Sequence, residues 1–420
     1  MRNLAPRSPS TRSRQQAGGT RLCGLARRLP ARRLPARLLL ACAVLSVILL
    51  STPAGASYGP PGSPQPNPAF AIPLSGSFTT STTTWATVVM GRNDGNFDLF
   101  WQLFSLDAAT GRFSLVTPPG VADNGGLMVA PDAGGSGALV GFGASQGLRF
   151  SPLAYSSDEG RAWSPGGLPD ALLGAPSVVA IGGRGDALAL AGGADPAVLD
   201  ERGSLTSWSV LTSRSRLSAT PAGRDCTIGS LEAVALAPGG IPLVGTSCRQ
   251  PDTPGVFVDS DRQWHLADIP VEARLAHDDF AVVRLQPSAA LLAAVHRRST
   301  SLVAVWETRS GHPWVMSAPL ELRRAGDLLA SGTGPGTEQF VLLASGGSLR
   351  AEVIAGPASA WHLLPQLPPR TATIAITPAG QIDALAVNVT KLTVWRLLPV
   401  TRSWRRIEAI TVPIVFGSSG

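Results

Sequence analysis

The sequence contains few residues of the types that build metal centres and nucleophilic active sites. Its 420 residues include 4 Cys, 5 His and 2 Tyr. No group of Cys and His has the spacing of a zinc site. Gly-x-Ser-x-Gly, phosphate-loop and His-Glu-x-x-His motifs are absent as well. We therefore expect no metal site and no cofactor, and the enzyme classes that these motifs define are excluded.

Acidic residues are absent from residues 1–37, which carry ten Arg. An apolar run of 13 residues, Leu38–Leu50, follows and leads to Ala54-Gly55-Ala56. This order is typical of a secretory signal peptide, so we assign residues 1–56 to a leader and expect a secreted or cell-surface protein. The apolar run is short for a membrane span. A twin-Arg leader, a lipid anchor at Cys42 and an uncleaved membrane anchor are alternatives.

Removal of the leader reverses the sign of the net charge. The whole chain is +7, whereas residues 57–420 contain 25 basic and 28 acidic residues and are therefore near −3. A nucleic-acid-binding protein needs a basic surface on its folded domain, so we expect no nucleic-acid partner. We also expect no membrane span in the mature chain. The Pro-rich residues 57–68 predict an extended tether before a domain of residues 69–420.

Two Cys residues remain after the leader, Cys226 and Cys248. Between them, the apolar runs Leu231–Ala237 and Ile241–Thr246 predict a hairpin that turns at Gly239-Gly240. The two Cys flank this hairpin. In an exported protein such a pair indicates a disulfide bond, with two buried free thiols as the alternative.

One turn carries the most specific pattern in the chain. Residues 156–163 fit Ser-x-Asp-x-Gly-x-x-Trp through Ser156, Asp158, Gly160 and Trp163. The Asp carboxylate and Ser hydroxyl can bind backbone amides of their own turn, Gly allows an unusual backbone conformation, and Trp adds a large apolar surface. This pattern resembles the Asp box, or BNR repeat, of sialidase-like β-propellers, where it stabilises the fold.

Similar aromatic residues recur along the chain, each after a polar or Gly-containing turn. Successive marks are 50, 45, 56, 50, 47 and 43 residues apart, and they are Phe113, Trp163, Trp208, Trp264, Trp314, Trp361 and Trp404. This spacing is that of one four-stranded propeller blade.

Between the marks lie short apolar runs separated by Gly and Pro, and none extends into a helix. We predict an all-β fold, a β-propeller of seven four-stranded blades, with six or eight blades possible and a β-sandwich pair as the rival. Ring closure has two solutions. Ala69–Leu74 can form the inner strand of the first blade, or Ile410–Phe416 can add a strand to that blade.

The resemblance to sialidases does not extend to their catalytic residues. The family's first Arg lies in a Phe-Arg-Ile-Pro-like motif, and the matching residues here place Ala71 in the Arg position. Sialidases also use a Tyr nucleophile. The only Tyr residues are Tyr58 in the tether and Tyr155 beside the box. The resemblance therefore implies the propeller fold without sialidase activity.

Polar residues in the predicted loops around the ring are the candidates for ligand binding. The loops that lead into inner strands, and those that join the second and third strands, form the usual ligand face of a propeller. Candidates are Asp123, Asn124, Arg224, Asp225, Arg249, Asp252, His277, Asp278 and Asp279. The run His277-Asp278-Asp279 is the densest titratable group and can supply an acid and a base. A solvated loop is the alternative.

We predict a propeller that binds a glycan or an envelope protein without catalysis. The alternative is a glycoside hydrolase-like enzyme that uses carboxylates in the central funnel. A third possibility is a structural role within an envelope complex.

Overall fold

The computed structural model describes residues 75–92, 98–118, 126–132, 135–143, 150–183, 185–296, 299–308, 313–357 and 359–413. All of them belong to one compact unit, residues 55–420. The predicted leader (residues 1–56), the tether (residues 57–68) and the Ala69–Leu74 segment lie outside the described residues, so predictions about them stay predictions.

The described residues form four-stranded antiparallel meanders, which we call blades one to seven in chain order. Blades one and two contain β1 (Gly76–Thr79), β2 (Thr84–Arg92), β3 (Asp98–Asp107), β4 (Arg112–Leu115), β5 (Leu127–Pro131), β6 (Ala138–Phe142), β7 (Ser151–Ser156) and β8 (Ser164–Leu168). Blades three and four contain β9 (Val179–Ile181), β10 (Asp186–Ala191), β11 (Ala197–Arg202), β12 (Ser209–Ser213), β13 (Ile228–Ala237), β14 (Ile241–Cys248), β15 (Val256–Ser260) and β16 (Gln263–Leu266).

Blade five contains β17 (Asp279–Gln286), β18 (Ala289–His296), β19 (Ser299–Glu307) and β20 (Trp314–Met316), with β21 (Leu320–Leu322) as a further partner of β19. Blades six and seven contain β22 (Leu328–Thr333), β23 (Gln339–Ser345), β24 (Ser348–Ile354), β25 (His362–Leu363), β26 (Thr371–Ile376), β27 (Ile382–Asn388), β28 (Lys391–Leu398) and β29 (Ser403–Thr411). Single 3-10 turns, η1 (Ala273–Leu275) and η2 (Ala325–Asp327), lead into blades five and six.

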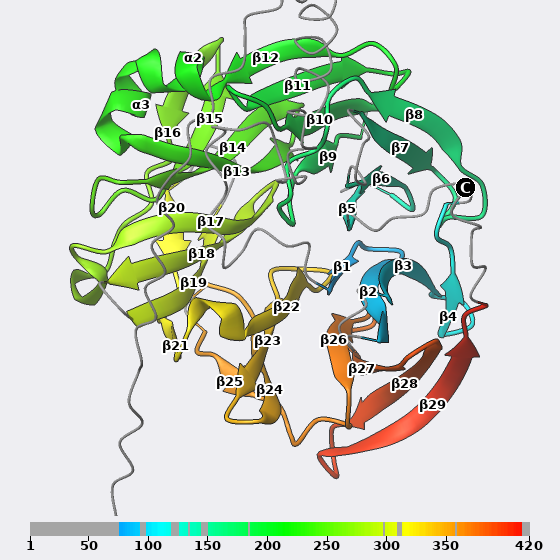
Figure 1. Ribbon diagram of the computed structural model, residues 1–420. Helices are drawn as coiled ribbons and strands as arrows, with labels where there is room; N and C mark the ends of the chain where they lie inside the picture. Colours follow the sequence, from blue (N-terminus) through cyan, green and yellow to red (C-terminus); the bar gives the residue numbers. More distant parts are fainter. Residues whose placement is uncertain are drawn as a thin grey trace, which may run out of the picture. The chain divides into compact units, whose positions relative to one another are not determined.

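The blades follow one another around a ring, with their first strands innermost (Figure 1). This arrangement confirms the predicted all-β propeller; the number of blades in the whole chain stays a prediction. The hydrophobic core lies between blades, since each buried cluster draws side chains from at least two neighbouring blades. A blade therefore gains its stability from its neighbours, because its own sheet cannot bury a face.

The seven aromatic marks occupy equivalent places in this ring. Each lies in the fourth strand of its blade or directly before it, as Trp264 does in β16 and Trp163 does before β8. The regular spacing in the sequence is therefore the spacing of outer strands.

Two short helices between β12 and β13 contradict the expectation of strands without helices. They are α2 (Arg214–Ala219) and α3 (Pro221–Cys226). The Ser213 hydroxyl accepts a hydrogen bond from the Arg216 amide and caps α2, and Thr220 caps α3 ahead of Pro221. Six residues are too few for a periodic pattern, so only the caps could have indicated helices.

The ring closes without the exchange of a strand between the first and last blades in the part of the chain that the structure describes. Ile410 and Thr411 belong to β29 and pair with β28 of blade seven, so the alternative that places them in blade one is wrong. Instead, β1 lies against β26. The Ser77 hydroxyl donates to the Ile374 carbonyl at 2.8 Å, and the Thr79 hydroxyl donates to the Ile376 carbonyl at 2.5 Å.

The turn over residues 156–163 is held by the side chains that define its pattern. The Ser156 hydroxyl donates to Asp158 Oδ1 at 2.8 Å and accepts from the Gly160 amide at 2.9 Å. Asp158 Oδ1 also accepts from the Ala162 amide at 2.9 Å, and these contacts hold the pKa of Asp158 below its usual range. Gly160 has a φ of 85°. Trp163 meets Trp85 edge-on, with ring centroids 6.3 Å apart.

Removal of the Ser156 hydroxyl should therefore weaken this blade. Ser156 is 1% exposed, so Ser156→Ala leaves the Gly160 amide buried without its acceptor. We expect a loss of roughly 1–2 kcal/mol in the free energy of unfolding, measured by urea denaturation. The neighbouring Ser157→Ala is the control, because the Ser157 side chain is exposed. An equal effect of both variants would show that the turn does not depend on Ser156.

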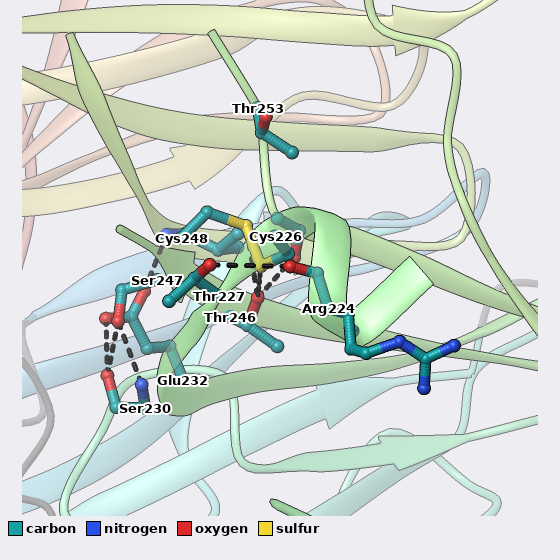
Figure 2. The surroundings of a disulfide bond; sticks show 12 residues. Arg224, Cys226, Thr227, Ser230, Glu232, Thr246, Ser247, Cys248 and Thr253 are labelled. Carbon is teal, nitrogen blue, oxygen red and sulfur yellow. Dashed lines mark hydrogen bonds between the residues drawn. A yellow bond between two sulfur atoms is a disulfide. The ribbon is translucent and has the colours of Figure 1, made fainter. Parts of the chain in front are cut away.

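A disulfide bond joins Cys226, the last residue of α3, to Cys248, the last residue of β14. Figure 2 shows the pair beside Thr246 and Ser247 of β14. Both side chains are buried. Gly255 makes room for the bond, since a Cβ at that position would lie 2.9 Å from Cys248 Sγ. The bond thus fastens the helical connection between blades three and four to the sheet of blade four.

Loss of this bond should destabilise the protein. The loop that it closes has a sequence separation of 22 residues, for which a chain-entropy estimate gives roughly 3 kcal/mol. The double variant Cys226→Ala/Cys248→Ala should unfold at a correspondingly lower urea concentration. Intact mass before and after reduction measures the bond itself, and an unchanged mass would mean that the purified protein lacks it.

Candidate functional site

Several predicted ligand residues lie apart from the others. Arg224 and Asp225 are exposed on α3, where Arg224 Nη1 donates to the Ala219 carbonyl at 2.6 Å. Arg249 follows β14, and its amide donates to the Thr227 carbonyl at 3.2 Å. In the described residues, no hydrogen bond or ion pair joins these three to the loop of residues 277–279. Asp123 and Asn124 lie outside the described residues.

Asp252 and the loop of residues 277–279 do come together. Asp252 Oδ1 accepts from the His277 amide at 2.7 Å, and the Asp252 amide donates to the Asp278 carbonyl at 3.3 Å. Both Asp252 and His277 have positive φ angles, 62° and 76°, which these contacts hold in place. The loop between β14 and β15 is thereby attached to the start of β17, where Asp279 is exposed.

Asp278 points inward and meets a residue that the sequence interpretation missed. Its Oδ1 lies 2.9 Å from His296 Nδ1 at the end of β18, and its side chain is 6% exposed. Burial raises the pKa of Asp278, the contact with His296 opposes this shift, and the negative charges of Glu321 and Asp252 add to it. A carboxyl group of this kind can hold a proton at a higher pH than an exposed one.

A polar hollow of about 210 Å³ adjoins this group over blades five and six. Its lining includes two acidic and two basic residues, Glu321, Asp327, Arg323 and Arg350. Glu321 lies opposite Ser301 of β19, and Ser299 at the start of the same strand pairs with His296, so Glu321 places the hollow near the Asp278 group. We call Asp252, residues 277–279, His296 and the lining of the hollow the candidate ligand surface.

Hydrogen bonds anchor three of the four charged residues of the hollow, Glu321, Asp327 and Arg350. Glu321 Oε1 accepts from the Ser301 hydroxyl at 3.0 Å, and Arg350 Nη2 donates to the Glu321 carbonyl at 3.3 Å. Asp327 Oδ2 accepts from the Arg324 amide at 3.1 Å. Charges of both signs are thus presented in fixed positions. Arg323 and Asp327 follow the Trp314 mark and precede an apolar run, so they lie in a loop that leads into an inner strand. His277 was selected because it lies in such a loop, and the same criterion could have selected Arg323 and Asp327.

A second buried carboxyl group belongs to the hairpin that carries the disulfide, and Figure 2 labels it as Glu232. Glu232 of β13 is 5% exposed. Its Oε2 accepts from the Val282 amide of blade five at 2.6 Å, and its Oε1 accepts from the Ser230 hydroxyl at 3.1 Å. Burial raises the pKa of Glu232 to about 7, although these hydrogen bonds oppose the shift. Glu232 therefore couples the stability of the junction between blades four and five to pH.

This coupling has a definite sign. The folded protein holds a proton on Glu232 up to about pH 7, whereas the unfolded chain releases it near its ordinary pKa of about 4.3. Stability should thus fall as pH rises between these values, by roughly 4 kcal/mol at most. Glu232→Gln keeps an acceptor for the Val282 amide and should remove this part of the pH dependence, measured by urea unfolding from pH 5 to pH 8.

Glu272→Gln, which changes a surface carboxylate, serves as the control and should retain the wild-type pH profile. An unchanged profile in Glu232→Gln would contradict the assignment.

The catalytic residues of sialidases are not assembled in the part of the chain that the structure describes. Tyr155 is its only Tyr and lies in β7 beside the Ser156 turn, away from the candidate ligand surface in blades four to six. Burial, followed by the charge of Asp132, raises the pKa of Tyr155, which opposes formation of a nucleophilic phenolate. Ala71 lies outside the described residues. Within those residues, no group of His, Cys, Asp and Glu could hold a metal ion.

No family model matches the sequence, and no curated protein matches it. Among solved structures, a GH74 xyloglucanase from Xanthomonas campestris is similar, with a TM-score of 0.51 and 15% identity over 80% of this chain and 54% of that chain. This chain thus spans about half of the xyloglucanase. A putative 6-phosphogluconolactonase from Bacteroides uniformis has a TM-score of 0.49 and 12% identity, with 79% and 97% covered.

The propeller domain of the Trilobed protease from Pyrococcus furiosus has a TM-score of 0.43 and 10% identity, with 83% and 98% covered. Identities this low concern the fold alone, and the xyloglucanase supports the β-propeller architecture. The closer kinship with sialidases stays a resemblance carried by the turn at residues 156–163. None of the helices among the described residues is long and apolar enough to cross a membrane.

Proposed function

We propose that this protein is a non-enzymatic propeller that binds a glycan at the candidate ligand surface. The main observation in support of this proposal is the polar hollow. It is lined by two carboxylates and two guanidinium groups, those of Glu321, Asp327, Arg323 and Arg350. Sugar hydroxyl groups both donate and accept hydrogen bonds, so carboxylates and guanidinium groups can bind them together. A volume of 210 Å³ is below the usual range of about 300–1,000 Å³ for drug-sized ligands, which favours a single sugar unit.

The non-enzymatic proposal is supported by the way three carboxylates of this surface are engaged. Asp252 and Asp327 accept hydrogen bonds from backbone amides, and Glu321 accepts one from Ser301. These bonds fix the carboxylates and the loops that carry them. Such carboxylates suit binding better than proton transfer.

We also propose that the protein works outside the cytoplasm, as a secreted or cell-surface protein. The predicted leader supports this location, and so does the buried Cys226–Cys248 bond, because disulfides persist in oxidising compartments. An envelope protein is the other partner class that the sequence predicts.

A glycoside hydrolase-like activity is the second candidate, and Asp278 is the observation that favours it. Its raised pKa and its contact with His296 suit a general acid. If this candidate is correct, the protein releases sugar from an oligosaccharide, and Asp278→Asn abolishes that release.

A glycan array with the purified protein tests the binding proposal. We expect selective binding that Arg323→Ala weakens by roughly tenfold, the effect of about 1.4 kcal/mol. Arg324→Ala is a matched control, since Arg324 is exposed but does not line the hollow. A blank array, or equal losses in both variants, would reject a glycan site in the hollow. Release of reducing sugar would favour the hydrolase.

A further inference from the structure

A buried cation without a counter-charge lies near the centre of the ring. Arg284 of β17 is 4% exposed, and no carboxylate of the described residues forms an ion pair with it. Its guanidinium carbon lies 4.7 Å from the centre of the Phe78 ring of β1. Burial lowers the pKa of Arg284 to about 9, so the group remains charged at neutral pH. An unpaired buried charge is costly, and it needs compensation.

The guanidinium group is held in place from three blades. Its Nε donates to the Ser331 hydroxyl of β22 at 2.6 Å. Phe78 covers one face of the guanidinium group. Gly76 allows β1 to lie close to this group, because a Cβ at position 76 would lie 2.8 Å from Arg284 Nη2. Contacts with blades six and one therefore hold the Arg284 side chain of blade five in one position. In this position the guanidinium group remains buried.

Donors surround the small cavity beside Arg284. The cavity measures about 10 Å³, and its polar lining consists of Arg284, Gln286, Ser331, Thr333 and Gln339. This volume is that of a site for a single small occupant of about the size of a water molecule.

Each polar group on the lining has a hydrogen to give. Ser331 accepts from Arg284, and Thr333 Oγ1 accepts from Gln286 Nε2 at 2.9 Å, so both hydroxyl hydrogens can point elsewhere. Gln339 is 4% exposed, and its Nε2 has no hydrogen-bond partner among the described residues. A water molecule can also hydrogen-bond here, because the Gln amide oxygens and the hydroxyl oxygens are acceptors. Only an anion also neutralises the buried Arg284 charge, so this charge favours an anion.

We propose that the ring binds one chloride-sized anion between Arg284, Ser331, Thr333 and Gln339. The anion neutralises the guanidinium group and satisfies the Gln339 amide. It thereby joins β17 of blade five to β22 and β23 of blade six beside the first strand of the ring. This site is separate from the candidate ligand surface, and its occupant is too small to be a glycan.

Chloride titration at constant ionic strength, with gluconate as the replacing anion, tests the proposal. A ligand that binds only the folded state raises the unfolding temperature, and we expect a rise of about 2–4 °C for the wild-type protein. Gln339→Leu removes one donor without removing the charge and should lose most of this rise. Gln263→Leu changes an exposed residue of β16 and should retain it. Arg284→Met should show no chloride response if it folds.

A bromide soak of wild-type crystals gives a second and independent measurement. We expect an anomalous peak beside Arg284. The proposal is overturned by an equal chloride response in Gln339→Leu and the wild type, by stabilisation with phosphate or sulfate but not chloride, or by a bromide map without a peak at this position.

Discussion

The packing of each blade against its neighbours is the interaction on which this structure depends, and at the junction of blades one and seven this packing closes the ring. No strand crosses that junction in the described residues. A shared cluster of buried side chains, including Phe104 and Leu106 of blade one and Leu385 and Val394 of blade seven, joins them instead. The Phe113 amide also donates to Glu408 Oε2 at 2.9 Å. Closure is thus achieved mainly by side chains.

The first strand of the ring, β1, contacts β26 with one face and Arg284 with the other. Successive side chains of a strand point to opposite faces. Ser77 and Thr79 bind carbonyl groups of β26, whereas Gly76 and Phe78 lie against Arg284. In addition, β1 pairs in parallel with β22 through Phe78 and Thr333. Four residues therefore connect the junction between the first and last blades with the buried charge at the centre.

Much of the fold was readable from the sequence because its signals are local. The Trp spacing predicts the outer strands, and the turn at Ser156 depends on residues within one segment. The candidate ligand surface was only partly predictable: Asp252 and His277 were selected, while Glu321 and Arg350 lie on different blades and meet only after the ring forms. Arg284 stands within an apolar run of β17, where the sequence alone shows neither its burial nor the donors around it.

Each blade is encoded by one uninterrupted stretch of chain. In a ring fastened by an exchanged strand, the two ends of the gene are tied to each other. Here, as far as the described residues reach, an in-frame duplication or deletion that begins before the first strand of a blade and ends after its fourth strand would add or remove one complete meander. The first strand, β1, has to be retained in such events, because its contacts with β26 close the ring. The whole meander, and not the single strand, is therefore the unit by which the size of this ring can change.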